Sequence, residues 1–143
     1  MDSQPNIKFI NFLLLFLVIL DIILSAICLL RPDLWVKLMH GTEYFDSLGL
    51  IRRMGAVWLA FFIFQLMALL LWQKHAYLLI LVAGIRFTEI FSDWFYWYFA
   101  EHLTWFAHFG LLISPPANFL FGIVLIKAYL KIEKQNNFDR IVK

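Results

Sequence analysis

The chain has 143 residues, of which 63% are hydrophobic and 19% aromatic, with a net charge of +2 and a mean hydropathy of +0.79. This composition excludes an ordinary soluble domain and indicates an integral membrane protein, and the small net charge excludes a nucleic-acid partner. The single cysteine, Cys28, excludes an internal disulfide and a thiolate metal cage.

Four apolar runs are long enough to cross a bilayer, which takes roughly 20 residues per helix. The first run is longer than the apolar part of a signal peptide and lacks a small-residue cleavage pattern, so we expect it to be retained. The connections after the second and third runs are so short that they demand antiparallel neighbours. The sequence therefore predicts one domain over residues 1–143, an all-α, four-helix up-and-down membrane bundle with helices at residues 9–30, 55–72, 76–98 and 104–130.

The longer connection between the first two runs predicts a short additional helix at about residues 33–40. Pro32 ends the first helix and Asp33 can cap a new one. Apolar and polar residues then alternate at helical spacing, which is typical of a helix lying on the membrane surface. A solvated loop with chance periodicity is the alternative.

The distribution of basic residues predicts the orientation. Seven lie on the side of the two termini and four on the other side, which favours cytoplasmic termini. Aromatic residues near the end of the third run then fall at the outer interface, where rings with one polar edge settle. We expect four polar residues to ring the outer mouth of the bundle: Arg52, Arg53, Glu101 and His102. The alternative is that their side chains simply snorkel to the membrane interface.

The third run contains a stripe of polar residues. At about 100° per residue, one helix face carries Arg86, Glu89, Asp93 and Trp97. An isolated charge inside a bilayer costs at least ~2.5 kcal/mol, so these side chains are expected to face protein or water and to have partners.

The other helices offer partners for this stripe. Asp21 lies near the middle of the first helix and is the natural partner of Arg86, and Gln65 lies near the middle of the second. His108 and Asn118 lie on one face of the fourth. These groups are either interhelical structural contacts or, because two carboxylates share one low-dielectric stripe, a ligand-anchoring or proton-carrying site.

The fourth run is interrupted by the triplet Ser114-Pro115-Pro116. Two successive prolines remove two backbone donors, so they should kink or interrupt the helix and free carbonyl groups near the midplane. Such an interruption either opens a place for a ligand or is a bend that fits the shape of the bundle.

Two motifs in this frame resemble a known family. Arg52-Arg53-Met54-Gly55-Ala56 with the following Leu59-Ala60, and Arg86 with a polar stretch ending near Asp93, resemble the small bacterial membrane proteins grouped as DoxX-like. The resemblance covers residues 14–130. It implies a four-helix bundle in the bacterial inner membrane with a quinone-facing or accessory-subunit role, since the family's named member looks like a membrane subunit of a quinone-reducing oxidoreductase. The acidic pair Glu89 and Asp93 and the double proline depart from the family pattern. The reaction of the named member is therefore the property that this resemblance implies least for the present chain.

Two classes of function follow. The sequence favours a non-enzymatic membrane protein, either an accessory subunit or a binder of an apolar molecule with a polar head, such as a quinone, lipid or pigment. Its partners would be bilayer lipid and either a larger membrane complex or further copies of the chain. The alternative is a small membrane enzyme or transporter that uses Glu89, Asp93 and His108 as a proton relay or acid/base site.

Several features weigh against the alternative and against a bound metal. The sequence has no HExxH motif and no phosphate-binding glycine loop. Haem ligation by two histidines is disfavoured, because His108 is the one histidine that falls within a predicted transmembrane helix. A single histidine could still bind the magnesium of a chlorophyll-type pigment. We therefore predict no metal site.

Overall fold

All regular structure in the part of the chain that the computed structural model describes, residues 5–44, 46 and 48–141, is helical. Three of its helices, the third in its segment Trp105–Gln135, are long and apolar enough to cross a membrane. The remaining long helix, α4, is more polar in its middle. The five described helices are α1 (Ile7–Leu30), α2 (Pro32–His40), α3 (Leu50–Leu71), α4 (Tyr77–Phe99) and α5 (Trp105–Ile141).

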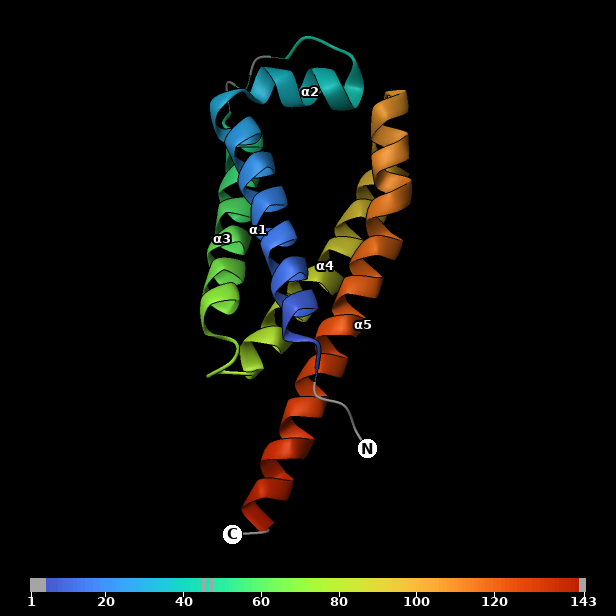
Figure 1. Ribbon diagram of the computed structural model, residues 1–143. Coiled ribbons are helices and arrows are strands. Elements are labelled where there is room, and N and C mark those ends of the chain that lie inside the picture. Colours follow the sequence, from blue (N-terminus) through green and yellow to red (C-terminus); the bar gives the residue numbers. More distant parts are fainter. Residues whose placement is uncertain (1–4, 45, 47, 142–143) are drawn as a thin grey trace.

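The long helices are arranged as two pairs, α1 with α3 and α4 with α5, and most contact between helices lies within these pairs. Figure 1 shows the pairs diverging toward α2 and approaching each other toward the end where the chain begins and ends. The main apolar core, which includes the fully buried Leu14, Leu79 and Leu125, joins the two pairs. Sequential neighbours α3 and α4 therefore share less contact than α1 and α3, although only a short connection separates them.

Small residues allow α1 and α3 to approach closely. A Cβ atom added at Gly55 would lie 2.9 Å from the Cβ of Cys28 and 3.0 Å from the backbone nitrogen of Leu29. At the same contact the buried Ser25 hydroxyl donates to the Gly55 carbonyl at 2.9 Å. Small side chains at a helix contact with an interhelical hydrogen bond are typical of helices packed in a membrane.

The short helix α2 lies across the end of the molecule (Figure 1) and is attached to the second pair. The Thr104 amide donates to the Met39 carbonyl at 2.8 Å, and Met39 packs against Ala107 and Leu111 of α5. Because α2 directly follows α1, it ties the end of the first pair to the end of the second.

Two helix ends lie far from their predicted positions, and one predicted interruption is absent from α5. α3 begins at Leu50 rather than at residue 55, because the Asp46 carboxylate accepts from the amides of Ile51 and Arg52, each at 3.2 Å, and so caps a polar first turn. α5 continues to Ile141 rather than ending at residue 130, since its polar extension is rich in helix-forming residues. The predicted interruption at the prolines is wrong, because α5 is one continuous helix, which bends along its course in Figure 1.

The Asp46 cap predicts an acid-sensitive contribution to stability. Burial opposes ionisation of Asp46, but the Ile51 and Arg52 amides and the Arg52 guanidinium outweigh it and hold the pKa below its ordinary value of 3.8. A depressed folded-state pKa stabilises the protein above the ordinary value, and this contribution is lost as the pH falls through the folded pKa. In thermal unfolding, Asp46→Asn should lower the melting temperature at neutral pH and converge with the wild type in acid. A difference that does not change with pH would contradict this.

Candidate functional site

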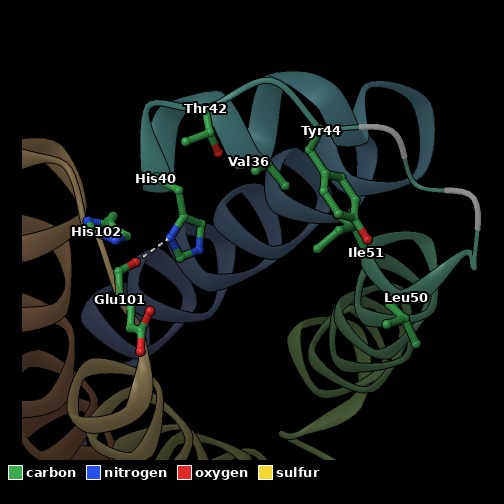
Figure 2. Close-up of a pocket in the computed structure, with 8 residues that line it drawn as sticks. All are labelled: Val36, His40, Thr42, Tyr44, Leu50, Ile51, Glu101 and His102. Carbon is green, nitrogen blue, oxygen red and sulfur yellow. Dashed lines mark hydrogen bonds between the residues drawn. The ribbon is translucent and has the colours of Figure 1, made fainter.

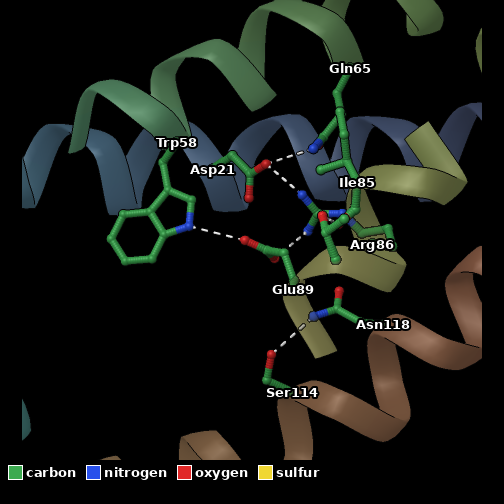
Figure 3. A network of polar contacts seen from close by, with 9 residues as sticks. Asp21, Trp58, Gln65, Ile85, Arg86, Glu89, Ser114 and Asn118 are labelled. Atoms are coloured by element: carbon green, nitrogen blue, oxygen red, sulfur yellow. Dashed lines mark hydrogen bonds and ion pairs between the residues drawn. The ribbon is translucent and has the colours of Figure 1, made fainter. Parts of the chain in front are cut away.

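A buried network of polar side chains joins the two helix pairs near the middle of the molecule (Figure 3). Asp21 of α1 accepts through Oδ2 from Arg86 Nη2 at 2.8 Å and from Gln65 Nε2 at 2.6 Å. On the other side of the guanidinium, Glu89 Oε2 lies 3.1 Å from Arg86 Nη1. Glu89 Oε1 in turn accepts from the indole of Trp58 at 3.1 Å. The Asp21–Arg86 pair expected from the sequence is present, and the network links α1, α3 and α4.

Sequence position explains why these groups meet. Asp21 and Arg86 lie near the middle of α1 and α4, and Gln65 lies nearer the end of α3, where antiparallel packing against α1 brings it to the level of Asp21. Arg86 and Glu89 are three residues apart and are therefore neighbours on the surface of α4. Trp58 lies two helical turns before Gln65 and shares its face, which was the available signal that it belongs to this site.

The network is fully enclosed at its centre but leaves some of its polar atoms without partners. Asp21, Gln65 and Arg86 are each 0% exposed, whereas the Glu89 side chain is 16% exposed. Within the described part of the chain, Asp21 Oδ1, Gln65 Oε1 and Arg86 Nε have no hydrogen-bond partner. Buried polar atoms are almost always paired, so a donor and two acceptors left over in one place are exceptional.

A second polar group lies at the contact of α4 and α5. Asn118 Nδ2 donates to Ser114 Oγ at 3.1 Å, and the Ser114 hydroxyl lies within reach of the Asp93 carboxylate. The hydrogen bond of Asn118 was expected to cross between helices. It instead runs within α5, because residues four apart lie one above the other on a helix. The buried Asp93 Oδ2 has no hydrogen-bond partner among the described residues.

Trp97 and His108 do not belong to the buried network. The Trp97 indole donates to His108 Nδ1 at 3.1 Å, and both side chains are exposed. Trp97 shares the azimuth of Arg86 on α4 but lies three turns further along, where the helix pairs have separated. The expected meeting of His108 with Glu89 and Asp93 is therefore wrong for this arrangement.

An open hollow of about 350 Å³ lies beneath α2, between the ends of the two helix pairs (Figure 2). Of the four residues that the sequence places around one mouth of the bundle, Glu101 and His102 line this hollow, but Arg52 and Arg53 do not. Arg52 is instead engaged with Asp46, at 3.2 Å. The lining residues are Val36, His40, Thr42, Tyr44, Leu50, Ile51, Glu101 and His102.

His40 is a polar residue of this hollow that the sequence did not single out as part of a site. Its Nδ1 donates to the Glu101 carbonyl at 3.1 Å, and its Nε2 lies 2.7 Å from the Tyr96 hydroxyl. The ring therefore fastens α2 to the end of α4. Position in the chain gives no sign of this role, since both partners lie more than fifty residues away.

Two tryptophans lie between the α2 end and the buried network. Trp35 of α2 and Trp58 of α3 meet edge to face, with ring centroids 5.1 Å apart. The nitrogen edge of Trp58 reaches Glu89, so its ring covers the least buried member of the network. The site thus combines flat apolar surface with charged and amide groups.

No protein-family model, curated protein or solved structure matches the chain. In the described residues, no three His, Cys, Asp or Glu side chains are grouped so that they could hold a metal ion. The function of the site is therefore inferred from the side chains and distances described above.

Proposed function

We propose that the protein is a small non-enzymatic membrane protein that binds an apolar molecule with a polar head, and that the head lies at the Arg86–Glu89 network. The observation that carries this proposal is the set of buried, unpartnered atoms: Asp21 Oδ1, Gln65 Oε1 and Arg86 Nε. A buried polar atom without a partner costs about 1–3 kcal/mol, and a ligand that supplies the missing hydrogen bonds offsets this cost.

The unpartnered atoms define the head group. Arg86 Nε is a donor and suits a carbonyl oxygen, whereas Asp21 Oδ1 and Gln65 Oε1 are acceptors and suit a hydroxyl group. A quinone or quinol, or a lipid with a hydroxyl head, has this chemistry. The rings of Trp35 and Trp58 supply flat surface for the apolar part. Glu89 is the most accessible member of the network and is the point of entry.

The proposal includes a membrane arrangement. We place α4 in the bilayer as a fourth span beside the three apolar ones, because Arg86 has a carboxylate on each side and the charges of Arg86 and Glu89 are thereby paired. α2 then lies at the outer surface of a four-helix bundle, with both termini in the cytoplasm. The basic residues near the termini and the resemblance to DoxX-like proteins support this arrangement, in a bacterial inner membrane.

The geometry favours ligand binding over a proton relay. A relay needs a continuous chain of hydrogen-bonded groups. His108 is instead hydrogen-bonded to Trp97 at an exposed position, and the Glu89 carboxylate already contacts Arg86 and Trp58. An accessory-subunit role is compatible with ligand binding, because the exposed apolar surface of α4 and α5 suits either lipid or another membrane helix.

Native mass spectrometry of the protein released gently from its membranes tests the proposal. We expect an added mass of a few hundred daltons on the wild-type chain, and its loss in Glu89→Gln, because the amide breaks the ion pair that positions Arg86. Glu101→Gln is the control, since it also removes a carboxylate but lies in the α4–α5 connection. Equal retention by the wild type and Glu89→Gln, or no added mass on the wild type, would overturn the proposal. Added mass matching a polypeptide identifies the subunit role.

A further inference from the structure

We infer that the contact of α4 and α5 holds a site for an alkali-metal cation, built from Asp93, Ser114, Asn118 and the backbone carbonyl of Leu111. The inference goes beyond the proposed binding of an amphiphile and does not depend on it. It also departs from the sequence expectation of no metal site, which rested on cysteine and histidine ligands.

The double proline supplies the first oxygen. Pro115 has no N–H, so it cannot donate to the carbonyl of Leu111, four residues earlier, and this carbonyl lacks its regular helical donor although α5 continues unbroken. Leu111, Pro115 and Asn118 are buried on one face of α5, and Leu111 belongs to the apolar cluster against which Tyr96 of α4 packs. The freed carbonyl is therefore on the side of α5 that meets α4. The equivalent carbonyl freed by Pro116 belongs to Leu112, which is 58% exposed.

Three side chains supply further oxygens on the same face. Asp93 Oδ2 is buried and has no partner among the described residues. Ser114 lies beside Asp93 and accepts from Asn118 Nδ2 at 3.1 Å, which leaves Asn118 Oδ1 as an acceptor. A carboxylate, a hydroxyl, an amide oxygen and a freed backbone carbonyl form the hard-oxygen set that alkali cations bind in membrane proteins.

The charge balance also calls for a cation here. Apart from Lys8 in the first turn of α1, the helices α1 and α4 carry one positive side chain, Arg86, and three carboxylates, those of Asp21, Glu89 and Asp93. Arg86 is already in contact with Asp21 and Glu89, at 2.8 Å and 3.1 Å. No salt bridge within the described residues reaches Asp93. A bound monovalent cation compensates this remaining carboxylate within a low-dielectric region.

Thermal unfolding of the purified full-length protein in detergent tests the site. Choline chloride is replaced stepwise by sodium chloride at constant ionic strength, with lithium and potassium chloride in parallel. A cation that binds only the folded state raises the melting temperature, and the rise grows with the logarithm of the cation concentration once this exceeds the dissociation constant. We expect such a rise in the wild type with at least one of the three ions and its loss in Asp93→Asn. Ser114→Ala should weaken the apparent affinity by about 10- to 100-fold.

Pro115→Ala gives the sharpest comparison, because it restores the N–H that the Leu111 carbonyl lacks without removing any side-chain oxygen. This variant should fold at least as well as the wild type in choline and should show a weaker response to the cation. Thr88→Ala is the matched control, since Thr88 is an exposed hydroxyl on α4 whose bond is to Ile85 of the same helix, and its response should equal that of the wild type. Equal melting temperatures in choline and in all three alkali ions, or a full response in Pro115→Ala and Ser114→Ala, would overturn the inference.

Discussion

Replacing Arg86 by methionine is expected to lower the free energy of unfolding by about 3–5 kcal/mol, the usual cost of removing one partner of a buried ion pair. Methionine has a similar length but no charge, so Asp21 and Glu89 would face each other across an apolar side chain. The cost arises because Asp21 is completely buried and would keep only its bond from Gln65. Reversible unfolding in mixed detergent, followed by circular dichroism, measures it.

Arg31→Met is the matched control for this prediction. Arg31 also forms an ion pair, with Asp33 at 2.9 Å, but both side chains are more than half exposed. Water screens such a pair, so we expect little change in stability. Similar losses in the two variants would show that the central network is no more important to the fold than a surface pair.

Gly55→Ala is expected to destabilise the protein by about 1–3 kcal/mol, the typical cost of inserting a methyl group into a packed contact. Its new Cβ would lie 3.0 Å from the backbone nitrogen of Leu29, and a backbone atom cannot rotate away as the end of a long side chain can. The α1–α3 contact would have to open, and the Ser25 hydrogen bond to the Gly55 carbonyl would lengthen.

Gly110→Ala provides the comparison, measured by the same unfolding assay. Gly110 is also helical, but a Cβ there meets nothing within 4 Å, so alanine should be neutral or stabilising by up to about 1 kcal/mol through its higher helix propensity. If Gly55→Ala proved as harmless as Gly110→Ala, the close approach of α1 and α3 would not contribute to stability.

The polar centre of the molecule could be predicted in part, because charges inside a membrane need partners. This requirement alone pointed Arg86 toward Asp21, and position along the helices gave the level at which they meet. Helical periodicity also places residues on a common face, but it does not show over what length of the helix other helices cover that face. Trp97 shares the face of Arg86 and is nevertheless exposed, because α4 extends beyond the region where the pairs touch.

Which helices pair with each other could not be predicted from the sequence, since the lipid-facing and the protein-facing sides of an apolar helix have similar compositions. The short connection between α3 and α4 suggested their contact, yet α3 packs mainly on α1 because Gly55, Ser25 and Cys28 allow a closer approach. The role of His40 was hidden for a related reason. Its partners lie at the far end of α4, and only the complete arrangement of helices brings them to α2.

The distance along the chain between Asp21 and Arg86 has a consequence for biosynthesis. The two residues are 65 positions apart, so Asp21 leaves the ribosome long before its partner Arg86 is synthesised. In a chain that inserts as it is translated, α1 must hold an unmatched carboxylate until α4, the third of the long helices, is made. If α4 spans the bilayer as proposed, it is the least apolar of the spans and gains a reason to remain there from Asp21, which is already in place. Insertion of the second half is thereby conditional on correct insertion of the first.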